Sequence, residues 1–398
     1  MKIVKAIGSL LLLFGLLFFL HVSIPGVPPL GKLFNPFSGF WQNTERNTNS
    51  DKEFTIQGLK DEVVVKYDDM GVPHIFAQND EDLYFAQGYV IARDRLWQME
   101  FYTLNAAGRL TEVVGEAALE YDRYNRRMGM AQAAHTIAEN LKNDPLSTSI
   151  LEPYAAGVNA RISELSDKDL SLEYKILDYK PEAWSVEKTV LMLMNMRQVL
   201  NGRSDDYRIT NIVKKYGLEV AKDLFPNYPE EESPIIPTGT NWDFSPVEIP
   251  QVPAQIMANG KEIAEFNIEK SNPNIGSNNW AIHGSKSATG LPILANDPHL
   301  TLSLPSIWYQ MQLHSPNVNV YGVALPGSPC ITIGFNKDIA WGVTNVGSDV
   351  MDFYEIKFKN TSRNEYWYEG TWKPVTKNVE KFKLKSGKIM VDTLLYTH

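Results

Sequence analysis

The stretch Gly276-Ser277-Asn278-Asn279-Trp280 lies where the character of the chain changes. Before it, residues 56–225 carry mainly helical patterns of apolar residues. After it, residues 277–398 carry short strand-like runs that alternate with turn residues. The sequence therefore predicts an α+β protein. Taken alone, the pentapeptide could equally be an ordinary loop, because Gly, Ser and Asn all favour turns.

Local patterns predict the elements on both sides of this stretch. Before it, two strands joined by a turn precede a helix that Asn79 or Asp80 caps and that ends near Leu104. Further helical patterns cover 130–142, 146–166, 185–200 and 205–224. After it, a Ser-Ala-Thr-Gly turn predicts a hairpin between residues 280–282 and 291–295. Strand-like runs follow at 319–324, 330–335, 339–344, 353–358 and 372–395.

The N-terminus has the pattern of an export segment. Lys2 and Lys5 precede an apolar run from Ile7 to Ile24, which is about the roughly 20 residues that a bilayer requires. Because prolines follow and no small-residue cleavage site is evident, an uncleaved anchor and a removed signal peptide both remain open. A buried core helix is a third interpretation. We expect the body of the protein to lie outside the cytoplasm, as a periplasmic or secreted protein.

The chain divides into segments by composition. Its 398 residues exceed one small core, so two lobes are expected. The predicted segments are a signal peptide or anchor (1–25), a Pro-rich tether (26–55), a mainly helical region (56–225), a linker or spacer (226–276) and a strand-rich region (277–398). An apolar-rich run continues almost to the last residue, which is typical of a strand cut in mid-sheet, so a fragment of a longer chain is expected.

Composition and motif searches exclude several classes of protein. A net charge of −9 argues against a nucleic-acid partner, which needs clustered cations. A single cysteine, Cys330, excludes an intrachain disulfide. Residues 26–32 match most of a P-loop, but Leu33 replaces the required Ser or Thr. The signatures of zinc proteases and α/β-hydrolases are absent, and the seven histidines are scattered.

Several motifs occur together in a fixed order. They are Asp69–Ile75, Gly88–Glu100, Gly108–Glu112, Ser277–Trp280, Asn296–His299, Pro326-Gly327, Gly334–Asn336 and Ala340–Asn345. In this order they resemble the penicillin acylase family of N-terminal nucleophile hydrolases, from about Lys60 onward. The resemblance implies a four-layer αββα fold, incomplete at the C-terminus, with a mainly helical N-terminal half.

The resemblance also implies that the precursor cuts itself between Gly276 and Ser277. We expect glycine before the serine to allow a strained backbone. The Ser277 hydroxyl would attack the preceding carbonyl, and the resulting ester would hydrolyse. Ser277 would then carry a free α-amine with a pKa of about 7.7–8.0, which suits a general base near neutral pH. Nucleophile and base would thus reside in one residue.

Other site residues are implied by their positions in the motifs. His299 is expected either to orient the Ser277 hydroxyl or amine, or to be structural. The Val346 N–H is expected to be one oxyanion donor, and the second, an Asn side chain, would come after residue 398. A calcium ion would be held by Asp205, Asp349, Asp352 and the Met351 carbonyl, although Asp205 could simply begin a solvated helix.

The expected function is therefore a self-processing acylase that cleaves the side-chain amide of penicillin-like or other N-acyl substrates. An acyl-homoserine lactone or long-chain N-acyl amide substrate is an alternative. A non-catalytic, membrane-tethered binding protein and a calcium-dependent structural module are alternatives of other classes. The expected partners are a small N-acylated substrate and the chain's own second half after cleavage, with possible membrane contact at the N-terminus. Met192, Met194 and Met196 form either plain core or a substrate wall.

Overall fold

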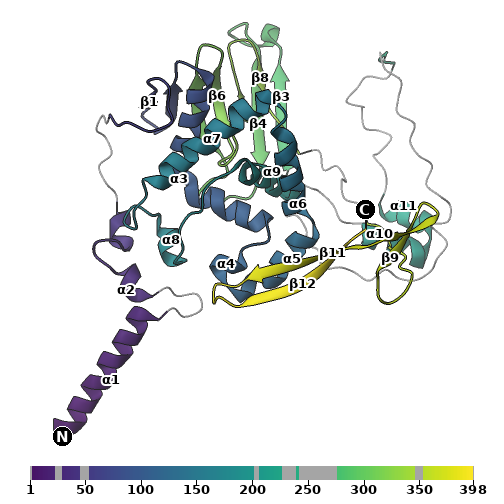
Figure 1. Cartoon of the computed structure of the whole chain (residues 1–398). Helices are drawn as coiled ribbons and strands as arrows, with labels where there is room; N and C mark the ends of the chain where they lie inside the picture. Colours follow the sequence, from purple (N-terminus) through teal and green to yellow (C-terminus); the bar gives the residue numbers. More distant parts are fainter. Residues whose placement is uncertain are drawn as a thin grey trace. The chain divides into compact units, whose positions relative to one another are not determined.

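The computed structural model describes residues 2–22, 29–44, 53–200, 206–225, 239–241, 276–345 and 353–397 (Figure 1). The chain forms two units. The first comprises residues 1–199, 275–345 and 356–398, and the second comprises residues 200–274 and 346–355. The second unit contains α10 (Asp206–Tyr216) and α11 (Leu218–Leu224), which Gly217 separates. All elements below belong to the first unit, apart from the last residue of α9.

A six-stranded sheet joins the two halves of the sequence. Its order is β1-β2-β5-β6-β7-β8, and all neighbours are antiparallel except the parallel pair β2 and β5. The strands are β1 (Val64–Tyr67), β2 (Pro73–Phe76), β5 (Tyr309–His314), β6 (Asn319–Ala324), β7 (Ile333–Phe335) and β8 (Ala340–Trp341). Residues before the helical region therefore share a sheet with residues after Ser277.

Two long helices form the main core with this sheet. α3 (Asp80–Ala106) begins at Asn79, whose side chain accepts a hydrogen bond from the Asp82 N–H, as the capping pattern predicted. α7 (Pro145–Ser163) packs against α3. Side chains of both helices share one buried cluster with Ile75 of β2 and with Met311 and Leu313 of β5. The sheet is thus held to the helices by apolar burial.

The first unit contains further helices and strands (Figure 1). The helices are α4 (Thr111–Val114), η2 (Glu116–Ala118), α5 (Leu119–Arg127), α6 (Met130–Leu141), α8 (Leu172–Ile176), α9 (Val186–Leu200) and η4 (Gly284–Lys286). The strands pair as β3 (Gly276–Ile282) with β4 (Ile293–His299), β9 (Glu365–Tyr368) with β10 (Thr371–Pro374), and β11 (Thr376–Lys383) with β12 (Ile389–Tyr396).

The N-terminal helix α1 (Lys2–His21) is long and apolar enough to cross a membrane, and none of its described residues is buried. It is followed by α2 (Leu30–Leu33) and η1 (Phe40–Asn43), both of which contact α8. The prediction of a tether over 26–55 therefore needs correction for residues 29–44. Local aromatic packing and hydrogen bonds to the body outweigh the turn-forming prolines and glycines of this segment.

The α+β class is confirmed. The strand predicted at 353–358 is wrong, because residues 353–357 have no strand pairing and Phe358 makes only an isolated bridge with Tyr366. β5 was not predicted, although its alternating buried residues carry a strand pattern.

Candidate active site

Ser277 and His299 lie on the two strands of the β3–β4 hairpin. The antiparallel register places Ser277 opposite Pro298 and Gly276 opposite His299. Directly paired residues point to the same face of a two-stranded sheet, and successive residues alternate faces. Ser277 and His299 therefore project from opposite faces of the hairpin. In the uncut chain, the structure does not bring the His299 ring to the Ser277 hydroxyl.

The Ser277 hydroxyl lies against the bond that the sequence predicted to be cut. Its Oγ is 2.5 Å from the carbonyl oxygen of Gly276 and donates a hydrogen bond to it. Both residues are partly exposed. The Ser277 hydroxyl is thus hydrogen-bonded to the carbonyl group of the bond that the sequence predicted to be cut.

Gly276 does not have the strained backbone that we expected of it. Its φ angle does not lie in the positive range that strained glycines adopt. A Cβ at this position would meet only the Nδ1 atom of His299, at 3.8 Å, which is an ordinary contact. The regular pairing of β3 with β4 keeps the backbone extended. In the uncut state, glycine is therefore not required here for conformational reasons.

His299 has a carboxylate partner that the sequence reasoning did not assign. Its Nε2 is 2.9 Å from the Asp297 Oδ2, and the two residues share one face of β4 because they are two positions apart. If Nε2 donates to this carboxylate, Nδ1 is left as a hydrogen-bond acceptor. Nδ1 is also the atom that a Cβ at Gly276 would meet. The signal for Asp297 was present in the quoted motif Asn296–His299.

Asn296 connects the hairpin to the segment that leads to Val346. Its Nδ2 donates to the Val343 carbonyl at 3.0 Å, and its Oδ1 accepts from the Val343 N–H at 3.1 Å. Gly342 permits this approach, because a Cβ there would lie 2.8 Å from the Asn296 Cγ. Asn296 stands in the motif Asn296–His299, but the sequence reasoning assigned it no role. It ties the strand that carries His299 to the segment that precedes the predicted oxyanion donor.

The remaining predicted site residues lie outside the described residues. They are the oxyanion donor Val346 and the calcium ligands Asp205, Asp349, Met351 and Asp352. Across the part of the chain that the structure describes, no group of three or more His, Cys, Asp or Glu residues is arranged to hold a metal ion.

The methionines of α9 belong to the core. Met192 and Met196 are 0% and 6% exposed, and Met194 packs against the cluster formed by α3, α6 and α9. Of the two readings that the sequence left open for these residues, the structure favours plain core.

The motif Gly88–Glu100 on α3 serves the scaffold. Buried Glu100 accepts hydrogen bonds from the Tyr174 hydroxyl at 2.8 Å and from the Glu182 N–H at 2.7 Å, and burial raises the pKa of its carboxyl group. Next to the motif, buried Gln87 pairs with both backbone groups of Cys330. These contacts hold the loop after β6 and the segment before α9 against α3.

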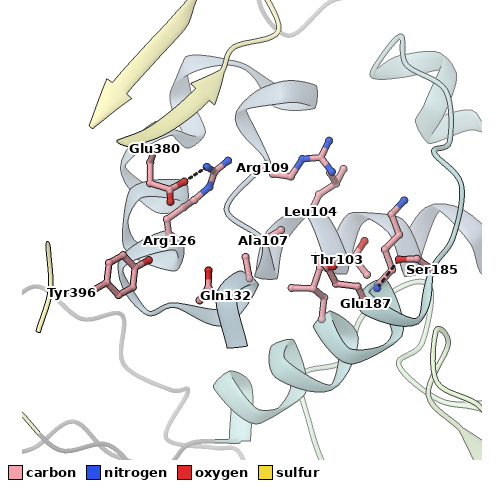
Figure 2. A pocket seen from close by; sticks show the side chains of 13 residues that line it. Thr103, Leu104, Ala107, Arg109, Arg126, Gln132, Ser185, Glu187, Glu380 and Tyr396 are labelled. Carbon is pink, nitrogen blue, oxygen red and sulfur yellow. Dashed lines mark hydrogen bonds and ion pairs between the residues drawn. The ribbon is translucent and has the colours of Figure 1, made fainter. Parts of the chain in front are cut away.

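A cavity of about 440 Å³ lies between α3, α6, α9 and the β11–β12 hairpin (Figure 2). It is lined by cations that already have carboxylate partners. Arg126 contacts Glu380 at 2.6 Å, and Arg109, which is paired with Glu182 at 2.7 Å, has a raised pKa because of its hydrogen bonds to carboxylates. None of the predicted site residues lines this cavity. The candidate active site is therefore the β3–β4 hairpin.

Comparisons with known proteins agree with the family resemblance that the motifs carry. The chain is 34% identical over 342 residues to the acyl-homoserine lactone acylase QuiP of Pseudomonas aeruginosa, covering 84% of this chain and 39% of the relative. It is 29% identical over 340 residues to the penicillin acylase 2 proenzyme of Pseudomonas sp. strain SE83, covering 84% of this chain and 42% of the relative. The chain thus spans about two fifths of the length of these relatives.

The chain is also similar to a solved structure, and it matches a family profile. The structure is a thermostable penicillin G acylase from Alcaligenes faecalis, with 25% identity and a TM-score of 0.37, covering 47% of this chain and 98% of that one. The penicillin amidase profile matches residues 62–398. Since that match extends over most of the sequence, the chain belongs to the penicillin amidase family, whose fold is that of the N-terminal nucleophile hydrolases.

Proposed function

We propose that this chain belongs to a self-processing amide hydrolase in which Ser277 becomes the nucleophile once the Gly276–Ser277 bond is cut. The observation that carries the proposal is the position of the Ser277 hydroxyl, 2.5 Å from the Gly276 carbonyl oxygen. Attack of Oγ on that carbonyl carbon breaks the peptide C–N bond and forms an ester. Breaking the C–N bond frees the α-amine of Ser277, and water then hydrolyses the ester, which frees the Gly276 carboxylate and regenerates the Ser277 hydroxyl.

In the cut enzyme, the α-amine of Ser277 takes the proton from its own hydroxyl as the hydroxyl attacks the substrate amide. The Val346 N–H donates to the oxygen of the tetrahedral intermediate, a contribution worth about 2.7–4 kcal/mol for one such donor. His299, held by Asp297, lies beside the position of the cut bond. Cleavage removes Gly276 as the strand partner of His299, so the ring can then approach the new α-amine.

The processing step is tested by expressing the chain with Ser277→Ala and, as a matched control in the turn of the same hairpin, Ser285→Ala. Wild type and Ser285→Ala should yield two shorter bands in place of the 45.0 kDa chain, with Ser277 as the first residue of one of them. Ser277→Ala should remain one band. Cleavage of Ser277→Ala at the same bond would refute the proposal, and an intact wild type would favour the non-catalytic binding protein.

The proposed substrate is an N-acylated amine, and the products are a carboxylic acid and a free amine. Relatives named as acyl-homoserine lactone acylases and as penicillin acylases support two substrate classes. Relatives named as acyl-homoserine lactone acylases are 29–34% identical to the chain and the penicillin acylase 2 proenzyme is 29% identical, so both substrate classes stay open. Mass spectrometry of the products from a series of N-acyl-homoserine lactones and from penicillin G separates the two.

The proposed enzyme is exported as a precursor, and its two cut chains remain together as a heterodimer. The apolar helix α1 supports either a signal peptide or a membrane anchor. We further propose that Asp205, Asp349, Asp352 and the Met351 carbonyl hold a calcium ion, because carboxylate and carbonyl oxygens are the ligands that Ca²⁺ prefers. Removal of calcium with EGTA should lower the melting temperature, and an unchanged value would overturn the calcium proposal.

A further inference from the structure

Residues Pro29–Thr44, here called the aromatic elbow, expose large apolar side chains directly after α1. Phe34, Phe37 and Trp41 are 49%, 82% and 51% exposed. The rings of Phe34 and Trp41 both pack against Phe40, with centroid distances of 5.6 Å for Phe34 and 4.0 Å for Trp41. Exposed aromatic side chains gathered on one short segment are typical of an interaction surface.

Hydrogen bonds fix the shape of the elbow. The Asn35 side chain accepts from the N–H groups of Phe37, at 2.8 Å, and Ser38, at 3.2 Å. The Trp41 Nε1 donates to the Phe34 carbonyl at 3.2 Å. These bonds hold the aromatic side chains in place, so the surface is preorganised and loses little conformational freedom on binding.

A second set of polar contacts fastens the elbow to the body of the protein. Lys32 forms an ion pair with Asp178 at 3.0 Å. The Lys175 Nζ donates to the Gly39 carbonyl at 3.1 Å and to the Asn43 Oδ1 at 2.8 Å. The side of the elbow that meets α8 is therefore polar and already satisfied, whereas the aromatic rings remain exposed.

The elbow contacts α1, which has the dimensions of a membrane span. α1 has 20 residues, an 18-residue window of it has a mean hydropathy of 2.5, and at 1.5 Å per residue the helix is about as long as the hydrocarbon thickness of a bilayer. α2 contacts the end of α1, because Gly31 approaches the Leu20 carbonyl so closely that a Cβ there would lie 2.6 Å from its oxygen. The elbow, which includes α2, thus lies at the C-terminal end of the apolar helix (Figure 1), where a bilayer that α1 spans would meet water.

The charge of the elbow favours a lipid partner that is recognised by apolar contact. Residues 29–44 include one lysine and no acidic residue, in a chain with a net charge of −9. Phe and Trp rings partition favourably to the interfacial region of bilayers. We propose that the aromatic elbow is seated in the interfacial region of a lipid bilayer and positions the body of the protein against the membrane. This rests on the proposed membrane contact of α1.

The experiment uses the full chain with Ser277→Ala, reconstituted with phosphatidylcholine vesicles that carry brominated acyl chains, which quench tryptophan fluorescence on contact. We compare the parent with Trp41→Phe and with a matched control, Trp367→Phe, which alters a tryptophan of β9 that is 43% exposed. The parent should float with the vesicles. Its quenching should be stronger with bromines near the headgroups than with bromines near the bilayer centre. That quenching should be lost in Trp41→Phe and kept in Trp367→Phe.

The outcomes separate the elbow from α1. A parent that does not float would overturn both the membrane contact of α1 and the elbow proposal. A parent that floats, but whose quenching is the same in Trp41→Phe, would overturn the elbow proposal alone. Flotation should also persist at high salt, since the elbow has almost no charge to be screened.

Discussion

Replacement of Gly157 on α7 by alanine should destabilise the protein, although alanine is the better helix former. Gly157 faces the Phe85 carbonyl of α3, and a Cβ at Gly157 would overlap the carbonyl oxygen and lie 2.8 Å from its carbon. Gly88 of α3 likewise faces the Tyr154 carbonyl of α7. Since the obstructing atoms are backbone, they cannot move away without a shift of a whole helix.

The expected magnitude is the difference between two opposing terms. Alanine in place of glycine in a helix interior gains up to about 1 kcal/mol. Overpacking of a tight core costs typically about 1–3 kcal/mol, and the upper end applies here because the contact is with backbone. We therefore expect Gly157→Ala to lose about 1–2 kcal/mol of unfolding free energy, taking overpacking at the upper end of its range.

The assay is urea unfolding of the uncut chain, in the Ser277→Ala background, followed by circular dichroism. Ala156→Gly, at the exposed neighbouring position of the same helix, calibrates the propensity term and should cost about 1 kcal/mol. If Gly157→Ala unfolded at the same or a higher urea concentration than its parent, α3 and α7 could not be packed as closely as described. The reasoning from glycine contacts would then fail.

Three further predictions concern the site and its support. His299→Ala should lower kcat on N-acyl substrates by about 10²–10⁴-fold. Asp297→Asn should lower kcat less, because the imidazole of His299 remains. Normal turnover by both variants would exclude both residues from catalysis. Arg109 holds the pKa of the Glu182 carboxyl down, from 4.5 to about 2, so this pair stabilises the fold above pH 4.5 and that contribution is lost as pH falls towards 2. The stability difference between wild type and Glu182→Gln should accordingly shrink over this pH range in urea titrations. Asn296→Ala loses two hydrogen bonds to the following segment and should slow both self-cleavage and turnover; unchanged rates for both would contradict the connecting role.

Local sequence signals predicted a substantial part of the fold. Asn79 and the acidic residues after it are a local signal for the start of a helix, and α3 begins where this signal predicted. The strand expected at 319–324 is β6 with the same bounds. The turn between residues 282 and 291 likewise predicted the β3–β4 hairpin, because turn chemistry and alternation are properties of neighbouring residues.

The order of the motifs was equally decisive for the family. Without any structure, it pointed to the stretch that carries Ser277, and the cut at the Gly276–Ser277 bond stays a prediction. What the motifs could not convey was the pairing of residues across the hairpin. Register placed Gly276, not Ser277, opposite His299, and a shift of one residue reverses the face of every side chain. The position of His299 opposite Gly276 and the hydrogen bonds between Asn296 and Val343 therefore became visible only in three dimensions.

The sequence by itself determined the α+β class, the main helices and the family, because these depend on periodicity, capping and short motifs. Only the tertiary structure decided that β2 pairs in parallel with β5 and that α3 and α7 approach through facing glycines. It also decided that residues 29–44 fold against α8 and do not hang as a free tether. The physical reason is that these features are contacts between residues far apart in the chain, and no local pattern records which distant surface a buried or exposed side chain will meet.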